Sequence, residues 1–334
     1  MNDVVSIIIP VYRAEDTVRR CVESLVHGTY PDIEVILVED CSPDQSWNAC
    51  LALQDKYSCV RAYRNVENSG VSATRNRGLQ EMTGKFLMFA DSDDWVEPDF
   101  ISSFVEAYQK YQPDLIVSGY MNHDEVQNAA TDYFGWKNEE AVIIKELKEE
   151  LLPLYQNRLL QQIWNKFFLA DVVREHHLTF DTSIHMGEDF RFLLTYLEHV
   201  PGNKLVQINK PLYHYIRCSG NSLMSQFGKE KLDEPLRNLN QMYTLIGMRE
   251  DEKAKQLEKD REAQINLWAY LIMHNMGMRQ KEKRQMILNL NPQNGRSLYR
   301  KNRSLYYKER VFVLAKRLGL TKPNGQKTGD VHEQ

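Results

Sequence analysis

The first 120 residues alternate between short apolar runs and amphipathic segments, and this alternation limits the possible folds more than any other feature. Strands that alternate with helices at such spacing form βαβ units, in which successive strands lie parallel in one sheet. The pattern therefore predicts an α/β domain with a mainly parallel sheet flanked by helices. The expected strands are residues 5–11, 33–39, 59–63, 85–91 and 114–120, and the expected helices lie near 15–27, 43–57, 70–82 and 98–111.

The remainder of the chain shows a different pattern. Residues 121–135 are polar and irregular, three later segments have helical spacing, and one segment has the pattern of a final strand pair. Beyond Ser225 the pattern is helical, with no strand signal. We therefore expect an α/β domain at residues 1–224 and a helical region at residues 225–334. The expected helices of the first domain are 139–156, 163–177 and about 188–199, and the expected strand pair is 204–216.

Local residues also predict where two of the early helices begin. Ser42 can cap the second helix, with Pro43 at the first helical position and Gln45 completing a capping box. Pro98 is expected to open the fourth helix, because proline suits the first position of a helix.

The composition predicts a cytoplasmic protein without disulfides or structural zinc. The 334 residues include no run of about 18 uncharged apolar residues, so no membrane-spanning helix is expected. The chain starts directly with a strand-like segment, which does not resemble a secretory signal. The cysteines lack CxxC or Cys/His spacing, which is typical of reduced thiols in a cytoplasm. They are Cys21, Cys41, Cys50, Cys59 and Cys218.

The net charge of −4 conceals a basic end: 14 of the 42 basic residues, but only 4 of the 46 acidic ones, follow position 278. Residues 296–320 contain eight basic residues and one acid, interleaved with apolar residues at helical spacing. Such a segment is typical of a helix that lies on an anionic membrane surface. Nucleic-acid binding and a helix packed on its own domain with a solvated basic face are the alternatives.

Acidic and amide side chains follow the expected strands at their carboxyl ends. Asp91, Asp93 and Asp94 follow the fourth strand, and Asp40 follows the second. Ligands of open parallel sheets bind at this edge, near the point where the strand order reverses. Mg²⁺ and Mn²⁺ take one or two protein carboxylates and fill their other positions with phosphate and water oxygens. The cluster therefore predicts a cation–diphosphate site, although a solvated acidic turn would leave the same trace. A haloacid-type phosphatase would need Thr where Trp95 stands.

Four stretches in this order and spacing resemble the inverting, nucleotide-sugar-dependent glycosyltransferases of family 2: SIIIPVYRAEDTVRRCVESL, EVILVEDCSPDQS, ENSGVSATRNRGL and FLMFADSDDW. The likeness resumes at WNKFF (164–168), GEDF (187–190) and YHYIRCSGNSL (213–223). This resemblance implies a GT-A type, Rossmann-like mixed sheet with a helical appendage. It also implies that one sugar moves from a nucleotide-sugar, most often a UDP-sugar, to a saccharide or lipid-linked acceptor of a bacterial surface polysaccharide or glycolipid.

The resemblance also implies roles for single residues. Asp189 matches the catalytic base, with Glu188 supporting it, and Asp93 matches the ligand of Mn²⁺ or Mg²⁺, with His214 as a further ligand. Asp40 would accept a hydrogen bond from the base. The expected nucleotide and donor contacts are Pro10, Val11, Tyr12, Asp40, Asn68, Gly70, Arg75, Asn76, Asp91 and Ser92.

Each of these residues also has a structural interpretation. Asp40 could cap a turn, Arg75 could lie on a solvated helix face, and Glu188 with Asp189 could complement a helix dipole. His214 could be a core or lid residue. Further expectations from the resemblance are contacts of Arg217 and Ser222 with the diphosphate, and of Trp164 and Asn165 with the acceptor.

The resemblance favours the membrane interpretation of the basic end, because lipid-linked acceptors lie at membranes. We expect a protein peripheral to the inner face of the cell membrane, with no nucleic-acid partner. Both a monomer and a homo-oligomer are compatible with the sequence. A non-catalytic nucleotide-sugar-binding protein is the alternative function. A receiver-type signalling domain would need a phosphoacceptor aspartate after the third strand and a lysine on the fifth, and the sequence has neither.

Overall fold

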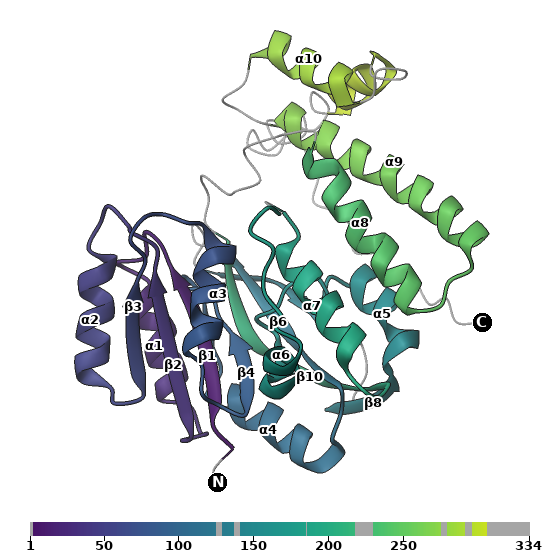
Figure 1. The fold of residues 1–334 in the computed structure, drawn as a ribbon. Helices are drawn as coiled ribbons and strands as arrows, with labels where there is room; N and C mark the ends of the chain where they lie inside the picture. The colour runs from purple at the N-terminus through teal and green to yellow at the C-terminus, as the bar shows by residue number, and fades with distance from the viewer. Residues whose placement is uncertain are drawn as a thin grey trace, which may run out of the picture. The chain divides into compact units, whose positions relative to one another are not determined.

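A ten-stranded mixed sheet forms the centre of the first unit of the chain (Figure 1). The computed structural model describes residues 3–124, 129–136, 141–184, 186–217, 230–274, 279–290 and 296–305. The chain divides into a unit of Met1–Gln226 with Asp233–Lys253 and a unit of Phe227–Leu232 with Ala254–Gln334.

Four strands make the parallel half of the sheet, in the order β3-β2-β1-β4. The strand order reverses between β1 and β4, and ligands of open parallel sheets bind at the carboxyl ends of the strands at such a point. Nearly every residue of β1 and β2 is buried, which explains why both strands are continuous apolar runs in the sequence. The strands are β1 (Val5–Val11), β2 (Ile33–Glu39), β3 (Val60–Arg64) and β4 (Phe86–Phe89).

The second half of the sheet is mixed. β9 pairs antiparallel with both β4 and β6, and the long β10 runs parallel to β6. β5 and β8 pair with β10, and β7 pairs with β6. The strands are β5 (Trp95–Val96), β6 (Leu115–Asp124), β7 (Ala129–Phe134), β8 (Val142–Glu146), β9 (Lys166–Leu169) and β10 (Lys204–Arg217).

Helices connect these strands and cover the sheet (Figure 1). α3 packs so closely on β1 that a Cβ atom at Gly78 would lie 2.4 Å from Ile8 Cγ2, so glycine is required there. The α/β fold expected from the sequence is confirmed. The helices are α1 (Val18–Val26), α2 (Ser46–Lys56), α3 (Val71–Glu81), α4 (Phe100–Tyr111), α5 (Leu147–Gln156), α6 (Ala170–Glu175) and α7 (Glu188–His199).

Several expectations about elements were wrong. α2 begins at Ser46 without a side-chain cap; Ser42 instead accepts a hydrogen bond from the Arg13 N–H. α4 begins two residues after Pro98. Four segments expected to be irregular, helical or a strand pair contain other elements, because pairing with distant strands determines their secondary structure. Parts of 121–135 form β6 and β7, part of 139–156 forms β8, part of 163–177 forms β9, and 204–216 lies within the single strand β10.

The described residues after β10 that have regular structure are helical, as expected. They form α8 (Glu230–Leu245), α9 (Glu250–His274), α10 (Gln280–Leu290) and a helical segment at 296–305. In that last segment Leu298 and Tyr299 are buried, and the Tyr299 hydroxyl lies 3.4 Å from Gln280 Oε1. Two apolar side chains of the described part of the basic tail are therefore buried, as in the packed-helix alternative, whereas Leu305 is 41% exposed. The other residues of the tail lie outside the described ranges. None of the helices described is long and apolar enough to cross a bilayer.

A buried carboxylate, Glu34 of β2, joins β1, β3 and the loop before β4 near the amino ends of the parallel strands. It accepts hydrogen bonds from the Ser6 hydroxyl, from the backbone N–H of Thr83 and Gly84 and from the Thr83 hydroxyl, and it pairs with Arg61. Burial raises the pKa of Glu34, but the hydrogen bonds from Ser6, Thr83 and Gly84 outweigh burial and bring it below its ordinary value.

We predict that Glu34→Gln lowers the free energy of unfolding at pH 7 by about 1–3 kcal/mol, because an amide nitrogen would face buried donors. The stabilisation by ionised Glu34 is fully present above the ordinary pKa of a glutamate and is lost as the pH falls through its lower folded-state pKa. Urea unfolding should therefore show a smaller difference between variant and wild type at acid pH. Glu23→Gln, at an exposed pair with Lys56, should change little. An equal loss in both variants would contradict this role of Glu34.

Candidate active site

The centre of the candidate site is the guanidinium of Arg75, which is 3% exposed and lies among three carboxylates. Its Nη1 is 2.7 Å from Asp189 Oδ1 and 3.6 Å from Glu188 Oε1, and its Nη2 is 3.1 Å from Asp91 Oδ1. Arg75 comes from α3, Asp91 follows β4, and the other two carboxylates begin α7. One buried cation thus joins three elements at the edge where the strand order reverses.

A reciprocal pair of hydrogen bonds joins Asn76 to Phe180, the residue that packs against Arg75. The Asn76 amide donates to the Phe180 carbonyl oxygen at 2.8 Å, and the Phe180 N–H donates to Asn76 Oδ1 at 2.7 Å. The Phe180 ring then lies 5.4 Å from the Arg75 guanidinium carbon, a favourable cation–π distance. The two hydrogen bonds of Asn76 thus fix the position of Phe180, whose ring lies against the Arg75 guanidinium.

The carboxylates of the start of α7 are held at a constrained turn. Gly187, the residue before the helix, has φ = 83°, a left-handed conformation that favours glycine. Glu188 and Asp189 occupy the first turn, where the helix dipole stabilises negative charge. Burial raises the pKa of Asp189 to about 7; the Arg75 guanidinium opposes this rise, and Glu188 adds to it. A carboxyl group with such a pKa can accept a proton near neutral pH and release it again.

The acidic loop after β4 is fixed by Tyr213 of β10. The Tyr213 hydroxyl donates to Asp94 Oδ2 at 2.7 Å and accepts from the Asp91 N–H at 3.0 Å. The Ile216 N–H donates to the other oxygen of Asp94 at 2.7 Å. Burial raises the pKa of Asp94 well above its ordinary value, with Asp93 and Asp91 adding to the rise. Asp94 is therefore a buried brace of the loop, whereas Ser92 and Asp93 lie in its partly exposed turn.

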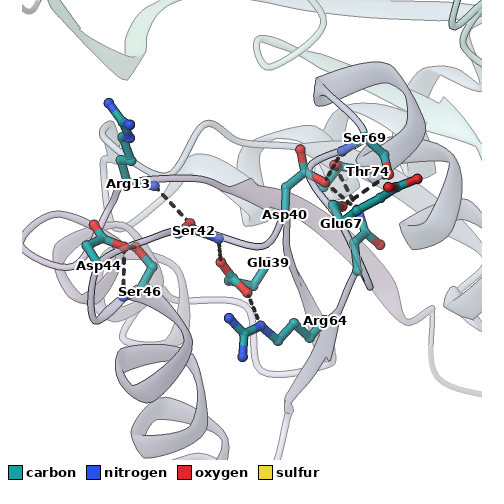
Figure 2. A network of polar contacts seen from close by, with 11 residues as sticks. Arg13, Glu39, Asp40, Ser42, Asp44, Ser46, Arg64, Glu67, Ser69 and Thr74 are labelled. Carbon is teal, nitrogen blue, oxygen red and sulfur yellow. Dashed lines mark hydrogen bonds and ion pairs between the residues drawn. The ribbon is translucent and has the colours of Figure 1, made fainter.

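A second polar network lies at the carboxyl ends of β2 and β3 (Figure 2). Oδ1 of Asp40 accepts from the Ser69 N–H and the Asn65 amide, and Oδ2 accepts from the Gly70 N–H, at 2.8–2.9 Å. Gly70 has φ = 83° and immediately precedes α3. Asp40 thus orders the loop that leads into the helix of Arg75.

The residues expected at the nucleobase differ in exposure. Tyr12 is 44% exposed, with the Arg13 guanidinium 5.4 Å from its ring centre, and Asn68 is exposed in the loop before α3. Pro10 is partly exposed, but the Val11 side chain is fully buried, so only its backbone borders this edge.

His214 lies in a separate stack beside the acidic loop. Its ring stacks on Trp95 with centroids 3.5 Å apart, and its nitrogens lie 2.8 Å from Glu97 Oε1 and 2.7 Å from His123 Nε2. Both ring nitrogens are thus engaged by side chains. Burial lowers the pKa of His214, and Glu97 opposes this. A metal ion bound by His214 would have to displace one of these partners.

The acidic loop fits a cation that arrives with a diphosphate. Within the ranges that the structure describes, no three His, Cys, Asp or Glu side chains are grouped to hold a metal. Mg²⁺ and Mn²⁺ nevertheless need only one or two protein carboxylates when phosphate and water supply the rest. Asp93, which lies partly exposed in this loop, and the second oxygen of Asp91 are the groups that could bind such a cation, whereas Arg75 already takes Asp91 Oδ1.

Sequence reasoning missed a buried cation near the candidate base. Lys166 is fully buried in β9, and its ammonium donates to the carbonyl oxygens of Leu159 and Gln162 and to Asn165 Oδ1. Burial lowers the pKa of Lys166 well below its ordinary value, and the nearby Asp189 carboxylate opposes this. The signal was a lysine within the otherwise apolar run KFFL. Trp164 and Asn165 are also buried: Trp164 stacks on Tyr213 at 4.2 Å and Asn165 donates to the Ser118 carbonyl oxygen.

The structure does not describe the side chains of Arg217 and Ser222, the two expected diphosphate contacts. Ser222 is outside the described residues, and of Arg217 only the backbone, at the end of β10, is described.

Comparison with known proteins places this geometry in a family. Residues 6–170 match the sequence model of glycosyl transferase family 2. Glycosyltransferase GlyA of Streptococcus pneumoniae is 31% identical over 220 residues, 64% of this chain and 31% of GlyA. Putative glycosyltransferase EpsH of Bacillus subtilis is 25% identical over 276 residues, 81% of this chain and 76% of EpsH. The chain belongs to glycosyl transferase family 2.

The fold of this family 2 glycosyltransferase is also found in a solved structure. S. aureus TarS 1-349 in complex with UDP-GlcNAc matches with a TM-score of 0.62 at 17% identity, covering 94% of this chain and 92% of the TarS chain. At this identity the likeness shows the GT-A type fold alone. The glycosyltransferase spans under a third of the length of GlyA but about three quarters of EpsH.

We predict that Arg75→Met lowers the free energy of unfolding by about 3–5 kcal/mol, because it leaves three partly buried carboxylates side by side without their cation. The loss should be larger at pH 8 than at pH 5, since Asp189, with a pKa of about 7, is protonated at pH 5 and then no longer repels its acidic neighbours. Denaturant unfolding at both pH values measures this.

Arg77→Met is the matched control, two residues along the same helix at an exposed pair with Glu81. It should change stability by less than about 1 kcal/mol. A pH-independent effect of Arg75→Met would contradict its role as a neutralising cation.

Proposed function

We propose that this glycosyltransferase moves one sugar from a UDP-sugar to a hydroxyl of a saccharide or lipid-linked saccharide, with inversion at the anomeric carbon. The observation that carries the proposal is the carboxyl group of Asp189, with a pKa of about 7, held 2.7 Å from Arg75 beside the acidic loop. The UDP-GlcNAc bound by the similar TarS structure supports a UDP-sugar donor.

In the proposed reaction, Asp189 accepts the proton of the acceptor hydroxyl as the oxygen attacks the anomeric carbon. The bond between that carbon and the diphosphate oxygen breaks in the same step, and no sugar–enzyme bond forms. Arg75 keeps Asp189 oriented and Glu188 nearby, so the base is in place before the acceptor arrives. Asp40 and the loop that it orders would border the nucleotide.

Asp93, with the second oxygen of Asp91, would bind Mn²⁺ or Mg²⁺ together with the donor diphosphate. When bound, such a cation supplies Lewis-acid stabilisation of the departing diphosphate. His214, whose ring stacks on Trp95, would support the acidic loop and would not bind the cation directly.

We predict that Asp189→Asn abolishes sugar transfer while Mn²⁺-dependent UDP binding stays within about twofold of wild type, because an amide cannot accept the proton. In the wild type, kcat should rise with pH through about 7, since only the ionised carboxylate is a base. UDP release from a panel of UDP-sugars with Mn²⁺ measures turnover and its pH dependence, and a titration with UDP and Mn²⁺ measures binding.

Asp93→Ala separates the two halves of the site, because it should weaken Mn²⁺-dependent UDP binding. Normal turnover by Asp189→Asn would refute the proposed base. Binding of UDP-sugars without any turnover in the wild type would favour the alternative, a non-catalytic nucleotide-sugar-binding protein.

We also propose that the basic end of the chain attaches to an anionic membrane surface by charge rather than by apolar insertion. In the described helical segment 296–305, four basic residues are exposed and no acidic residue occurs, whereas Leu298 and Tyr299 are buried. Each basic side chain near an anionic surface contributes about 1 kcal/mol of attraction. The exposed residues are Arg296, Arg300, Lys301 and Arg303.

Replacing these four residues by Gln should reduce flotation with vesicles that contain phosphatidylserine and leave the weak binding to neutral vesicles unchanged. Raised salt should weaken wild-type binding to the same level. Lys255→Gln with Lys259→Gln, at exposed positions of α9 in the same unit, is the matched control and should float as the wild type does. Unchanged flotation of the fourfold variant would exclude this surface.

A further inference from the structure

Helix α8, which follows the sheet in sequence, contributes one buried amide to the start of α7 within the first unit. Asn238 is 1% exposed and lies beside the buried side chains of Leu239 and Met242 on α8. Its Nδ2 donates to the Gly187 carbonyl oxygen at 2.8 Å, and its Oδ1 accepts from Arg191 Nε at 2.6 Å. Both polar atoms of this buried side chain are therefore used, and both partners belong to the first turn of α7.

The carbonyl that Asn238 binds is the one that begins the helix. The Gly187 oxygen also accepts the Arg191 N–H at 3.0 Å, the first hydrogen bond of α7. A Cβ atom at position 187 would lie 3.0 Å from Asn238 Nδ2, so the amide approaches a position that glycine keeps open. Glu188 and Asp189 follow directly, so this contact fixes the residue from which the candidate base projects.

The start of α7 needs such a contact from outside the helix. The residue before α7 provides no side-chain cap, because it is a glycine. The bond of Asp189 with Arg75 is at 2.7 Å, and a shift of the first turn by an ångström would lengthen it beyond hydrogen-bonding distance. An apolar residue at position 238 would suit the neighbours of Asn238 better, so packing alone does not explain a buried amide here.

We propose that Asn238 is a positioning residue for sugar transfer: by binding the Gly187 carbonyl and Arg191, it sets the first turn of α7 so that Asp189 faces the acceptor. This inference rests on the proposed function of Asp189 as the base. It also makes α8 part of the catalytic apparatus, although α8 lies outside residues 6–170, which match the family model.

The decisive variant is Asn238→Asp, which keeps the size of the side chain and the acceptor for Arg191 but removes the donor to Gly187. A carboxylate oxygen would face the carbonyl oxygen, so the first turn should shift. We expect kcat for UDP release from the best UDP-sugar of the panel to fall by about tenfold to a hundredfold, with KM within about twofold. Asn240→Ala, at an exposed position of the same helix, is the matched control and should keep wild-type kcat.

The pH profile distinguishes positioning from loss of folded protein. If the first turn shifts and Asp189 moves away from Arg75, the pH midpoint of kcat should rise above the wild-type value, whereas a smaller folded fraction would scale the profile without moving it. Gly187→Ala, which crowds the same amide from the other side, should move the profile in the same direction and serves where Asn238→Asp does not fold. Wild-type kcat in Asn238→Asp, or a scaled but unshifted profile in both variants, would overturn the proposal.

The double variant Asn238→Asp/Asp189→Asn separates this inference from the proposed base. If Asn238 acts through Asp189, adding Asn238→Asp to Asp189→Asn should leave the residual turnover unchanged. A further fall would overturn the inference while leaving the base intact. Normal turnover in Asp189→Asn alone would instead refute the base.

Discussion

The ion pairs of Arg75 are the interaction on which the site depends. A buried guanidinium is costly to desolvate, and it is stable here because three carboxylates surround it. Those carboxylates are in turn tolerable side by side only because the guanidinium lies among them. The neighbouring features act on this one group: the missing side chain of Gly78 brings α3 close to β1, and Asn76 places the Phe180 ring beneath the cation.

Burial has different results at two aspartates of the same site because their partners differ. Among the described residues, a tyrosine hydroxyl and a backbone N–H are the hydrogen-bond partners of the Asp94 carboxylate, which braces the loop against β10. Asp189 has a cation beside it and a second carboxylate next to it, and these opposing effects leave its pKa at about 7. A group poised near neutrality is suited to accept and release protons, whereas a group shifted further is suited to structure.

The sequence predicted the parallel half of the sheet well because three of its four strands, β1, β2 and β4, are buried on both faces, whereas the outer strand β3 is largely exposed. Continuous apolar runs bounded by turns mark such strands without knowledge of their partners. β9 and β10 were harder: the KFFL run lies inside a segment with helical spacing, and only pairing with β4 and β6 makes it a strand. The cap predicted from Ser42 failed because its hydroxyl serves the Arg13 backbone across the crevice instead.

Candidate site residues could be named individually, but their grouping could not. Arg75 was expected to contact the nucleotide, with a solvated helix face as the alternative, but nothing local indicates that α7, more than a hundred positions later, places two carboxylates against it. Asn238 and Lys166 carry even less local signal, since each donates to a backbone carbonyl oxygen, a group that any sequence provides. Contacts of this kind become visible only when the fold brings distant segments together.

Under the proposed function, charge balance accounts for the carboxylate cluster that follows β4. Arg75 is one cation among Asp91, Glu188 and Asp189, and Asp93 adds a further carboxylate nearby, so the site without a donor is acidic. A bare diphosphate would be repelled from such a site, while a diphosphate that carries a divalent cation would be attracted. The same carboxylates that need Arg75 for stability would thus select the cation-bound form of the donor.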